Sequence, residues 1–263
     1  MIRAKKSLGQ NFLISPRIVG AIVDAANLKK GELAIEIGPG KGVLTKALLD
    51  AGARVKAIEK DDRLIPVLAE SFRDDISRKN LELIHGDILE TNIESLATGP
   101  ESYKVIANIP YYVTGAIVRN FLSAKEKPSE MILMVQKEVA DRVIARDGKE
   151  SILSLSVKVY AKPELIMNVS RGNFFPIPNV DSAVIRLADI HNPFANKKSE
   201  ENFFEIVRAG FAQKRKKLSS NLSSVREKET VAAAFKKLGM GENTRAEDVP
   251  LESWILLSEA LLG

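Results

Sequence analysis

The sequence predicts an α/β protein with a doubly wound parallel sheet, followed by a small all-helical domain. Two observations predict the sheet: short apolar strands alternate with amphipathic helices, and a glycine-rich turn joins the first strand to its helix. From about residue 192 the apolar spacing becomes purely helical, which predicts the second domain. A chain of 263 residues can bury one large core and one smaller core. We therefore expect domains at 1–191 and 192–263.

The N-terminal part is expected to begin with a helix. Ser15 suits a helix cap, Pro16 suits the first turn, and apolar residues recur at helical spacing before Gly31. A strand at 33–37 then runs into the turn Gly38-Pro39-Gly40-Lys41-Gly42. Further expected elements are a helix ending at Gly52, strands at 54–59, 81–84, 105–107 and 131–135, and a helix at 64–72.

The later chain is expected to close the sheet with an antiparallel pair of strands. Two apolar runs, 165–169 and 183–187, flank a proline-bearing loop at 174–178, as strands joined by a turn do. The remaining expected elements are a helix at 137–146, a segment at 151–160, and helices at 201–217, 228–238 and 251–262.

Composition excludes several classes of protein. The chain has no cysteine, so it cannot form a thiolate nucleophile, a zinc finger or an iron–sulfur cluster. His85 and His191 lack the spacing of a metal site, and no G-x-S-x-G motif supports a serine triad. No apolar run approaches the ~20 residues of a membrane helix, and the first residues lack the apolar stretch of a secretory signal. We expect a cytoplasmic protein without metal or membrane, and a monomer by default.

Positive charge is concentrated in two places. The net charge is +5, and the first 30 residues hold six basic residues against one acidic residue. A second cluster, Lys214-Arg215-Lys216-Lys217, stands in a stretch without acidic residues that starts at Arg208. Such clusters suit a polyanionic partner, although a solvated helix face is a common alternative.

The glycine turn and two carboxylates indicate a cofactor site. Gly38 and Gly40 leave the backbone uncovered where open α/β sheets bind nucleotide-like ligands. Glu59 ends the next strand, 21 residues after Gly38, where a carboxylate accepts hydrogen bonds from both ribose hydroxyls. Asp87 ends the strand after that, in position to bind an adenine amino group, although Gly86-Asp87 is also an ordinary turn signal.

These residues indicate an adenosine-containing cofactor without choosing between NAD and S-adenosylmethionine. The third glycine comes one residue too early for G-x-G-x-x-G, which favours S-adenosylmethionine. The plainer alternative is a tight turn followed by an exposed glutamate.

Asn108-Ile109-Pro110-Tyr111 ends the fourth strand and faces the reacting end of such a cofactor. An exocyclic adenine nitrogen becomes nucleophilic when acceptors on its N–H bonds draw its lone pair out of conjugation. The side-chain oxygen of Asn108 and the backbone carbonyl of Pro110 are suitable acceptors, and Tyr111 offers a face for the base. Phe174 is placed to close over the other face of the base, or to act as a hydrophobic plug. A plain strand-to-loop turn is the alternative for the tetrapeptide.

The missing cysteine bears on the target of such a reaction. Methylation at pyrimidine C5 ordinarily requires a thiolate, whereas methylation of an amino group does not. The missing cysteine therefore favours transfer to an amino group over transfer to pyrimidine C5.

The sequence resembles the bacterial small-subunit ribosomal RNA adenine dimethyltransferases, a family related to the erythromycin-resistance rRNA methylases. The matching stretches follow the order of the family: 5–13, 36–42, Glu59, Gly86-Asp87, 108–111 and 174–182.

The resemblance implies a Rossmann-like, S-adenosylmethionine-dependent methyltransferase domain and a helical C-terminal domain that binds RNA or the ribosome. It implies an N-terminal arm that packs over the cofactor, with Asn11 and Leu13 as contacts. Phe174, rather than Phe175, is the implied partner of Tyr111 in stacking on the adenine.

The resemblance also assigns parts of the cofactor to residues at the ends of the strands. It implies Gly38 at the methionine end, Glu59 at the ribose, Asp87 at the adenine and Asn108 beside the transferred methyl group. Gly40 belongs to the same cofactor-binding turn.

The implied substrate is a pair of adjacent adenosines in the 3′-terminal hairpin loop of 16S rRNA, each methylated twice on N6 within pre-30S particles. Three alternatives stay open at this point. They are a large-subunit rRNA methylase of the resistance type, a mainly non-catalytic ribosome-assembly or nucleic-acid-binding factor, and an NAD-dependent oxidoreductase.

Overall fold

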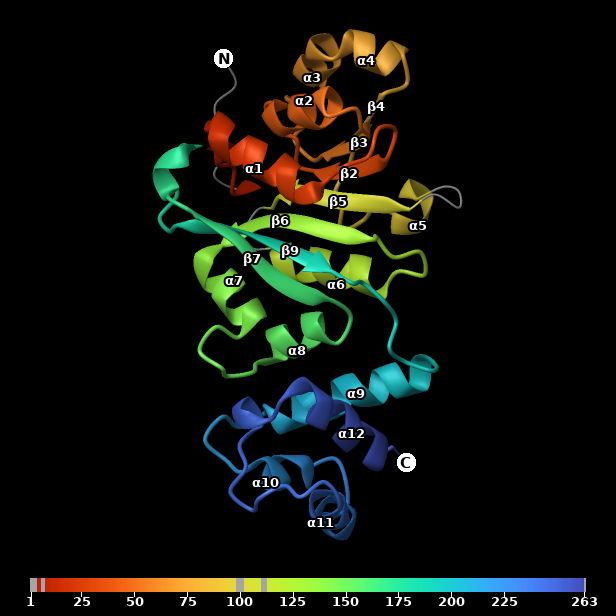
Figure 1. Cartoon of the computed structure of the whole chain (residues 1–263), viewed down its shortest axis with the longest axis vertical. Helices are drawn as coiled ribbons and strands as arrows, with labels where there is room; N and C mark the ends of the chain where they lie inside the picture. The colour runs from red at the N-terminus through yellow and green to blue at the C-terminus, as the bar shows by residue number, and fades with distance from the viewer. Residues whose placement is uncertain (1–3, 6–7, 98–101, 110–112, 263) are drawn as a thin grey trace. The chain divides into compact units, whose positions relative to one another are not determined.

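The computed structural model describes residues 4–5, 8–97, 102–109 and 113–262, and the chain divides into two compact units (Figure 1). The first unit comprises Met1–Ala140 and Ala161–Ile190, and the second comprises Asp141–Tyr160 and His191–Gly263. The division after Ile190 lies close to the domain boundary expected at residue 192. Residues 141–160, which the sequence analysis assigns to the first domain, group with the second unit.

The first unit is built on a seven-stranded sheet of order β4-β3-β2-β5-β6-β9-β7. Strands β2 to β6 run parallel, and β9 is antiparallel to both of its neighbours. The doubly wound sheet and the closing antiparallel pair are therefore confirmed. The strands are β2 (Leu33–Ile37), β3 (Arg54–Glu59), β4 (Leu81–His85), β5 (Tyr103–Asn108), β6 (Glu130–Gln136), β7 (Lys162–Val169) and β9 (Ser182–Ala188).

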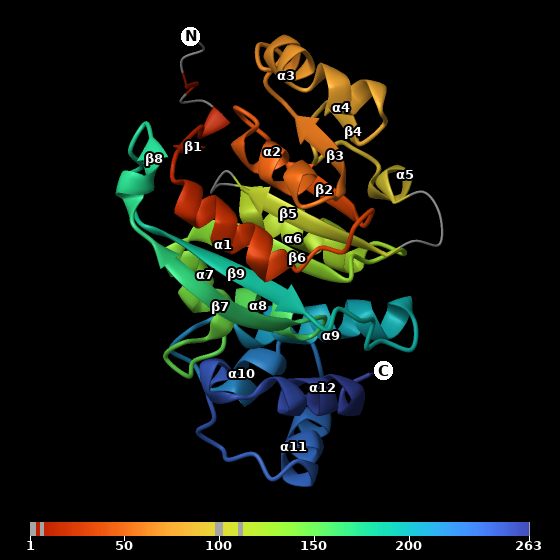
Figure 2. The ribbon, with the colours of Figure 1, turned by 45° about the horizontal axis from the view of Figure 1, so that its top comes forward.

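Helices cover both faces of this sheet. α1 and α2 lie on one face and α6 lies on the other (Figures 1 and 2). Ile22 of α1 and Leu48 of α2 are almost fully buried in a cluster that includes Ala34 and Ile106 of the sheet. The helices are α1 (Pro16–Ala26), α2 (Val43–Asp50), α3 (Ile65–Ser71), α4 (Arg73–Ser77), α5 (Ile93–Leu96), α6 (Thr114–Ser123) and α7 (Lys137–Ile144), which crosses the unit boundary.

A two-stranded sheet lies beside the main sheet. β1 (Phe12–Leu13) pairs antiparallel with β8 (Phe174–Phe175), which follows the 3-10 helix η3 (Arg171–Asn173). The sequence analysis did not predict these strands, because two residues are too few to show an alternating pattern. Their pairing ties the N-terminal arm to the loop before β9 (Figure 2).

The second unit is helical and packs around Trp254, which is fully buried. Phe211 stacks on Trp254 with ring centroids 5.6 Å apart. Arg226 donates hydrogen bonds to Asn202, Glu205 and the Leu261 carbonyl. Its elements are α8 (Ile152–Lys158), α9 (Lys197–Gly210), α10 (Leu218–Leu222), α11 (Lys228–Lys237), the 3-10 helix η4 (Ala246–Asp248) and α12 (Leu251–Ala260).

The C-terminal end predicted for the helix at 201–217 is wrong, because the helix ends earlier. α9 ends at Gly210, and α10 begins only at Leu218. The Asn221 side chain donates to the carbonyls of Gly210 (2.6 Å) and Gln213 (3.1 Å), so it satisfies acceptors left free where the helix stops. Within the described ranges, no helix is long and apolar enough to cross a membrane.

Candidate active site

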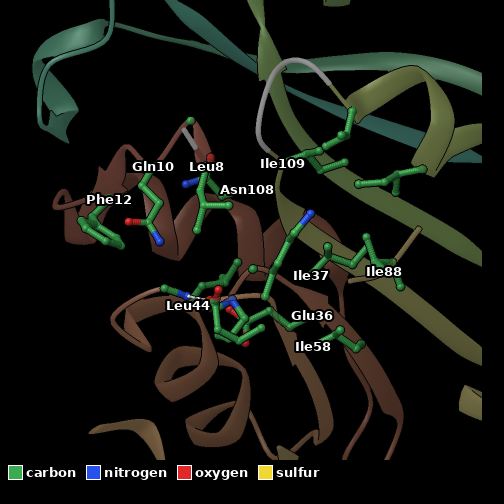
Figure 3. Close-up of a pocket in the computed structure, with 18 of the residues that line it drawn as sticks. Leu8, Gln10, Phe12, Glu36, Ile37, Leu44, Ile58, Ile88, Asn108 and Ile109 are labelled. Atoms are coloured by element: carbon green, nitrogen blue, oxygen red, sulfur yellow. Dashed lines mark hydrogen bonds between the residues drawn. The ribbon is translucent and has the colours of Figure 1, made fainter. Parts of the chain in front are cut away.

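A pocket opens at the carboxyl edge of the parallel strands in the first unit, where open α/β sheets bind ligands (Figure 3). The strand ends and the N-terminal arm both contribute to its wall. The structure brings together seven predicted site residues at this pocket: Asn11, Leu13, Gly38, Gly40, Glu59, Asp87 and Asn108.

The turn after β2 requires glycine at more than one position. Gly38, Gly40 and Gly42 have φ values of +68°, +58° and +79°, which other residues rarely adopt. A Cβ atom on Gly42 would lie 2.5 Å from the ring of Phe72, and one on Gly40 would lie 3.0 Å from the ring of Phe12. The backbone of this turn therefore faces the pocket without side chains at the glycine positions, between the sheet and the arm.

Glu59 ends β3 and is 5% exposed. Its Oε2 accepts a hydrogen bond from the Gly40 amide (3.0 Å), and its Oε1 accepts one from the Asp61 amide (2.8 Å). Burial raises the pKa of the Glu59 carboxyl, although these two hydrogen bonds act against the increase. The carboxylate is thus fixed in orientation, with oxygens that have further lone pairs for a ligand.

Asp87 follows β4 at the same edge. Its Oδ2 accepts a hydrogen bond from the Lys60 ammonium (2.6 Å), and its Oδ1 accepts one from the Leu89 amide (3.0 Å). Burial opposes ionisation of Asp87, but these hydrogen bonds outweigh it and lower the pKa of the carboxyl. Asp87 is therefore a charged acceptor at the pocket.

Gln10 attaches the arm to the strand ends. Its Nε2 donates to the buried carboxylate of Asp61 (2.7 Å), and its Oε1 accepts from the Lys5 amide (2.7 Å). Hydrogen bonds from Arg63 and Gln10 hold the pKa of Asp61 well below its usual range. Since the Asp61 amide also donates to Glu59, one chain of hydrogen bonds links the arm to Glu59.

Asn108 ends β5, and its side chain lines the pocket (Figure 3). Its Nδ2 donates to the backbone carbonyl of Asn11 in the arm (3.3 Å). This contact leaves the amide oxygen for a role as acceptor. The predicted catalytic residues Pro110 and Tyr111 lie outside the described residues.

Of the two roles expected for Phe174, the structure matches the hydrophobic plug. The side chain is 1% exposed, belongs to the hydrophobic core and pairs across the ladder with Leu13. Because the Phe174 ring is almost fully buried, neither of its faces is free to stack on a base. The side chain acts as a hydrophobic plug. The next residue, Phe175, is 61% exposed.

The residues of the pocket fit S-adenosylmethionine. Glu36 in β2 lines the pocket and is 1% exposed, and its Oε2 has no hydrogen-bond partner among the described residues. Burial, together with the nearby charge of Glu59, raises the pKa of the Glu36 carboxyl to about 8. A ligand with an N–H donor would satisfy this atom, and the methionine ammonium of S-adenosylmethionine supplies such donors. Ile58 and Ile88 add apolar walls suited to a purine ring.

The fold and the site together define a Rossmann-like methyltransferase that uses S-adenosylmethionine. The family model described as "Ribosomal RNA adenine dimethylase" matches residues 1–262. The chain belongs to this family.

Relatives match nearly the whole chain. A protein from Dehalococcoides mccartyi named "Ribosomal RNA small subunit methyltransferase A" is 41% identical, covering 96% of this chain and 87% of the relative. The protein of the same name from Geobacillus thermodenitrificans is 40% identical, with coverage of 98% and 91%.

Two solved structures are also similar over most of their length. The 23S rRNA methyltransferase ErmE is 29% identical with a TM-score of 0.76, covering 95% of this chain and 99% of that one. A dimethyladenosine transferase from Plasmodium falciparum is 25% identical with a TM-score of 0.80, covering 94% and 95%.

Several contacts and environments of the site could not be predicted from the sequence. Glu36 reads as one position of a buried strand, and nothing local marks its unpaired oxygen. Gln10 and Asp61 are 51 residues apart, so their contact depends on the folded chain. The position of Lys60 could have been predicted, because a lysine directly after a strand-ending glutamate also lies at the carboxyl edge of the sheet.

Proposed function

We propose that the protein transfers methyl groups from S-adenosylmethionine to N6 of two adjacent adenosines in the 3′-terminal hairpin loop of small-subunit rRNA. Each adenosine is methylated twice, within pre-30S particles in the cytoplasm, and the enzyme acts as a monomer. The observation that carries the proposal is the position of Asn108, at the end of β5 in the cofactor pocket. The names of the relatives, at about 40% identity, favour the small subunit as the substrate.

Asn108 prepares the nitrogen that accepts the methyl group. Its amide oxygen accepts a hydrogen bond from the adenine amino group, and its amide nitrogen is held by the Asn11 carbonyl. An acceptor on an amino N–H bond favours tetrahedral geometry and frees the lone pair for attack. When bound, S-adenosylmethionine supplies an electrophilic methyl carbon on a sulfonium. The amino group becomes acidic as its new bond forms, so water can take the proton and no strong base is needed.

Pro110, Tyr111 and Phe174 are the other residues proposed to act on the base. Pro110 supplies a second acceptor through its carbonyl, and Tyr111 stacks on the base; both assignments rest on the sequence. Phe174 supports the site from the core in the described arrangement. A stacking contact between Phe174 and the base requires the Phe174 ring to leave the core, because its side chain is 1% exposed.

The proposed cofactor contacts come from the resemblance, and the position of these residues in one pocket supports them. Glu59 binds the ribose hydroxyls, Asp87 binds the adenine amino group, and Gly38 and Gly40 lie against the methionine end. Asn11 and Leu13 belong to the arm that lies over the cofactor.

Labelled S-adenosylmethionine and small-subunit particles lacking the modification provide the test. We expect label on adenine N6, and we expect Asn108→Ala to abolish it while binding of S-adenosylhomocysteine stays measurable. Asn80→Ala is the matched control, because Asn80 is exposed before β4, at the opposite edge of the sheet. Label on another base, or full activity of Asn108→Ala, contradicts the proposal.

A large-subunit target is the second candidate, and the similarity to ErmE favours it. The two candidates differ in their substrate, so free large-subunit rRNA belongs in the same assay. We expect it to be inert; label transferred to it in place of the small-subunit particle would establish the second candidate.

A further inference from the structure

Large apolar side chains are exposed around the two-stranded sheet of the first unit. Phe175 is 61% exposed, Ile177 63%, Val180 44%, and Ile14, directly after β1, 56%. Single exposed apolar residues are common on protein surfaces, but a group on one short loop and its paired strand indicates a binding surface. Phe175 is the aromatic residue of this group, and its exposed ring can stack on a planar base.

Strand pairing places Phe175 beside Phe12, a residue that lines the cofactor pocket. Phe175 lies directly opposite Phe12 in the antiparallel ladder, so both side chains project from the same face. Directly opposed residues have Cβ atoms about 5 Å apart. Phe12 is 7% exposed and lines the pocket, whereas its partner ring is open to solvent. The exposed Phe175 ring therefore lies next to Phe12, a residue of the pocket wall.

A positive charge lies next to the Phe12 ring. The Lys41 ammonium is 4.9 Å from the centroid of the Phe12 ring, and Lys41 is exposed. Arg171, also exposed, begins the short 3-10 helix that leads into β8. An aromatic face beside a cation suits a nucleotide of a single strand, because the ring stacks on the base and the cation binds the phosphate. These few side chains make too small a surface for a stable protein partner, since such interfaces bury about 1,200 Å² or more.

We propose that Phe175 and Lys41 form a subsite for an unpaired nucleotide of the RNA substrate, adjacent to the target adenosine. The base of this nucleotide stacks on the Phe175 ring, and its phosphate binds the Lys41 ammonium. The subsite rests on the proposed function, and it adds a contact that holds the RNA strand while the target base enters the pocket. Phe175 is not among the residues that line the cofactor pocket, so we expect its contact to act on the affinity for RNA.

Three variants test the base contact: Phe175→Ala, Phe175→Tyr, which keeps a ring, and Val67→Ala as a control. Val67 is 47% exposed on α3, away from the ladder, so its truncation removes a similar exposed apolar surface. We expect Phe175→Ala to raise the KM for the RNA particle about tenfold, with kcat and S-adenosylhomocysteine affinity unchanged. Phe175→Tyr and Val67→Ala should both behave as wild type.

A fluorescent base gives a readout that does not need methyl transfer. An RNA hairpin with 2-aminopurine beside the target adenosine should lose fluorescence on binding wild-type protein, because stacking quenches it. We expect Phe175→Ala to abolish most of this quenching and Phe175→Tyr to keep it. Quenching that persists in Phe175→Ala, or an unchanged KM, overturns the base contact. Wild-type protein that quenches the probe but methylates no adenine would instead overturn the proposed function.

Lys41→Gln tests the phosphate contact. We expect it to reduce the slope of log affinity against log salt for RNA by about 1. A loss of S-adenosylhomocysteine affinity with an unchanged salt slope would assign Lys41 to the cofactor and overturn this contact.

Discussion

Glu36 is a carboxyl group buried in the site, with one oxygen that has no hydrogen-bond partner among the described residues. A carboxyl group with a pKa of about 8 in the folded protein and 4.5 in the unfolded chain holds its proton more tightly when folded. Stability from this group is complete below pH 4.5, and it declines as pH rises from 4.5 towards 8, at about 1.4 kcal/mol per pH unit. The free energy of unfolding therefore falls as pH rises and Glu36 approaches ionisation.

Glu36→Gln should remove this decline. Its amide stays neutral at every pH, so we expect the stability of the variant relative to wild type to increase between pH 5 and pH 8. Urea unfolding at several pH values measures the effect. The control Glu82→Gln changes an exposed carboxylate paired with Lys56, and it should keep the wild-type decline. Parallel curves for wild type and Glu36→Gln would contradict the assignment.

At the scale of elements, hydrogen bonds, strand pairing and the burial of Phe12 and Leu13 hold the N-terminal arm. Gln10 binds Asp61, Asn108 binds the Asn11 carbonyl, and β1 pairs with β8. Each contact joins the arm to an element that lines the pocket or adjoins it. We infer that order in the arm and order in the cofactor site depend on each other.

Gln10→Ala tests this dependence. The change removes a hydrogen bond to a buried carboxylate, and we expect S-adenosylmethionine to bind about tenfold more weakly, equivalent to about 1.4 kcal/mol. Asp61 keeps its bond to Arg63, so the strand ends should stay folded. Calorimetric titration gives the affinity, with Gln213→Ala, an exposed position in the second unit, as control. Equal affinities would show that the arm does not support the cofactor.

The basic segment 214–217 is the element most suited to RNA phosphates in the second unit. It lies between α9 and α10, and all four side chains are exposed. Lys214 is 4.0 Å from Glu247, which offsets part of its charge. We therefore expect Arg215, Lys216 and Lys217 to carry most of the attraction.

Changing Arg215, Lys216 or Lys217 to Gln should weaken binding to the particle and reduce its salt slope by about 1 per residue. Lys46→Gln is the control, because Lys46 is paired with Asp50 on α2. Filter binding at several salt concentrations measures both quantities. An affinity loss without a change in slope would mean that these residues do not contact phosphate.

Elements with a clear period could be predicted from the sequence, and those without one could not. The five parallel strands and α1 have long apolar patterns, and the prediction matches them. β1 and β8 are two residues each, and their formation depends on pairing between segments about 160 residues apart. The glycines and the acids Glu59 and Asp87 could be predicted to line a pocket because strand ends meet at one edge. The contact of Gln10 with Asp61, and the burial of Phe174 beside an exposed Phe175, depend on tertiary packing.

For the whole molecule, the division into two units separates cofactor binding from the helical part. Every residue that lines the pocket belongs to the first unit, among the described residues. The core of the second unit is tight around Gly210, where an added Cβ would meet Trp254 and lie 2.8 Å from Leu218.

Gly210→Ala should therefore destabilise the protein without weakening the cofactor site. Overpacking of this kind costs about 1–3 kcal/mol. We expect a lower unfolding temperature in calorimetry and an unchanged dissociation constant for S-adenosylhomocysteine. A large change in that constant would show that the helical unit contributes to the cofactor site.

The ladder between β1 and β8 has only two residue pairs. Under the proposed reaction, one ribosomal particle consumes four donor molecules, and each spent molecule must leave before the next enters. Detachment of β1 breaks few backbone hydrogen bonds, but it also exposes the buried side chains of Phe12 and Leu13. The brevity of the ladder is thus compatible with repeated turnover on a single particle.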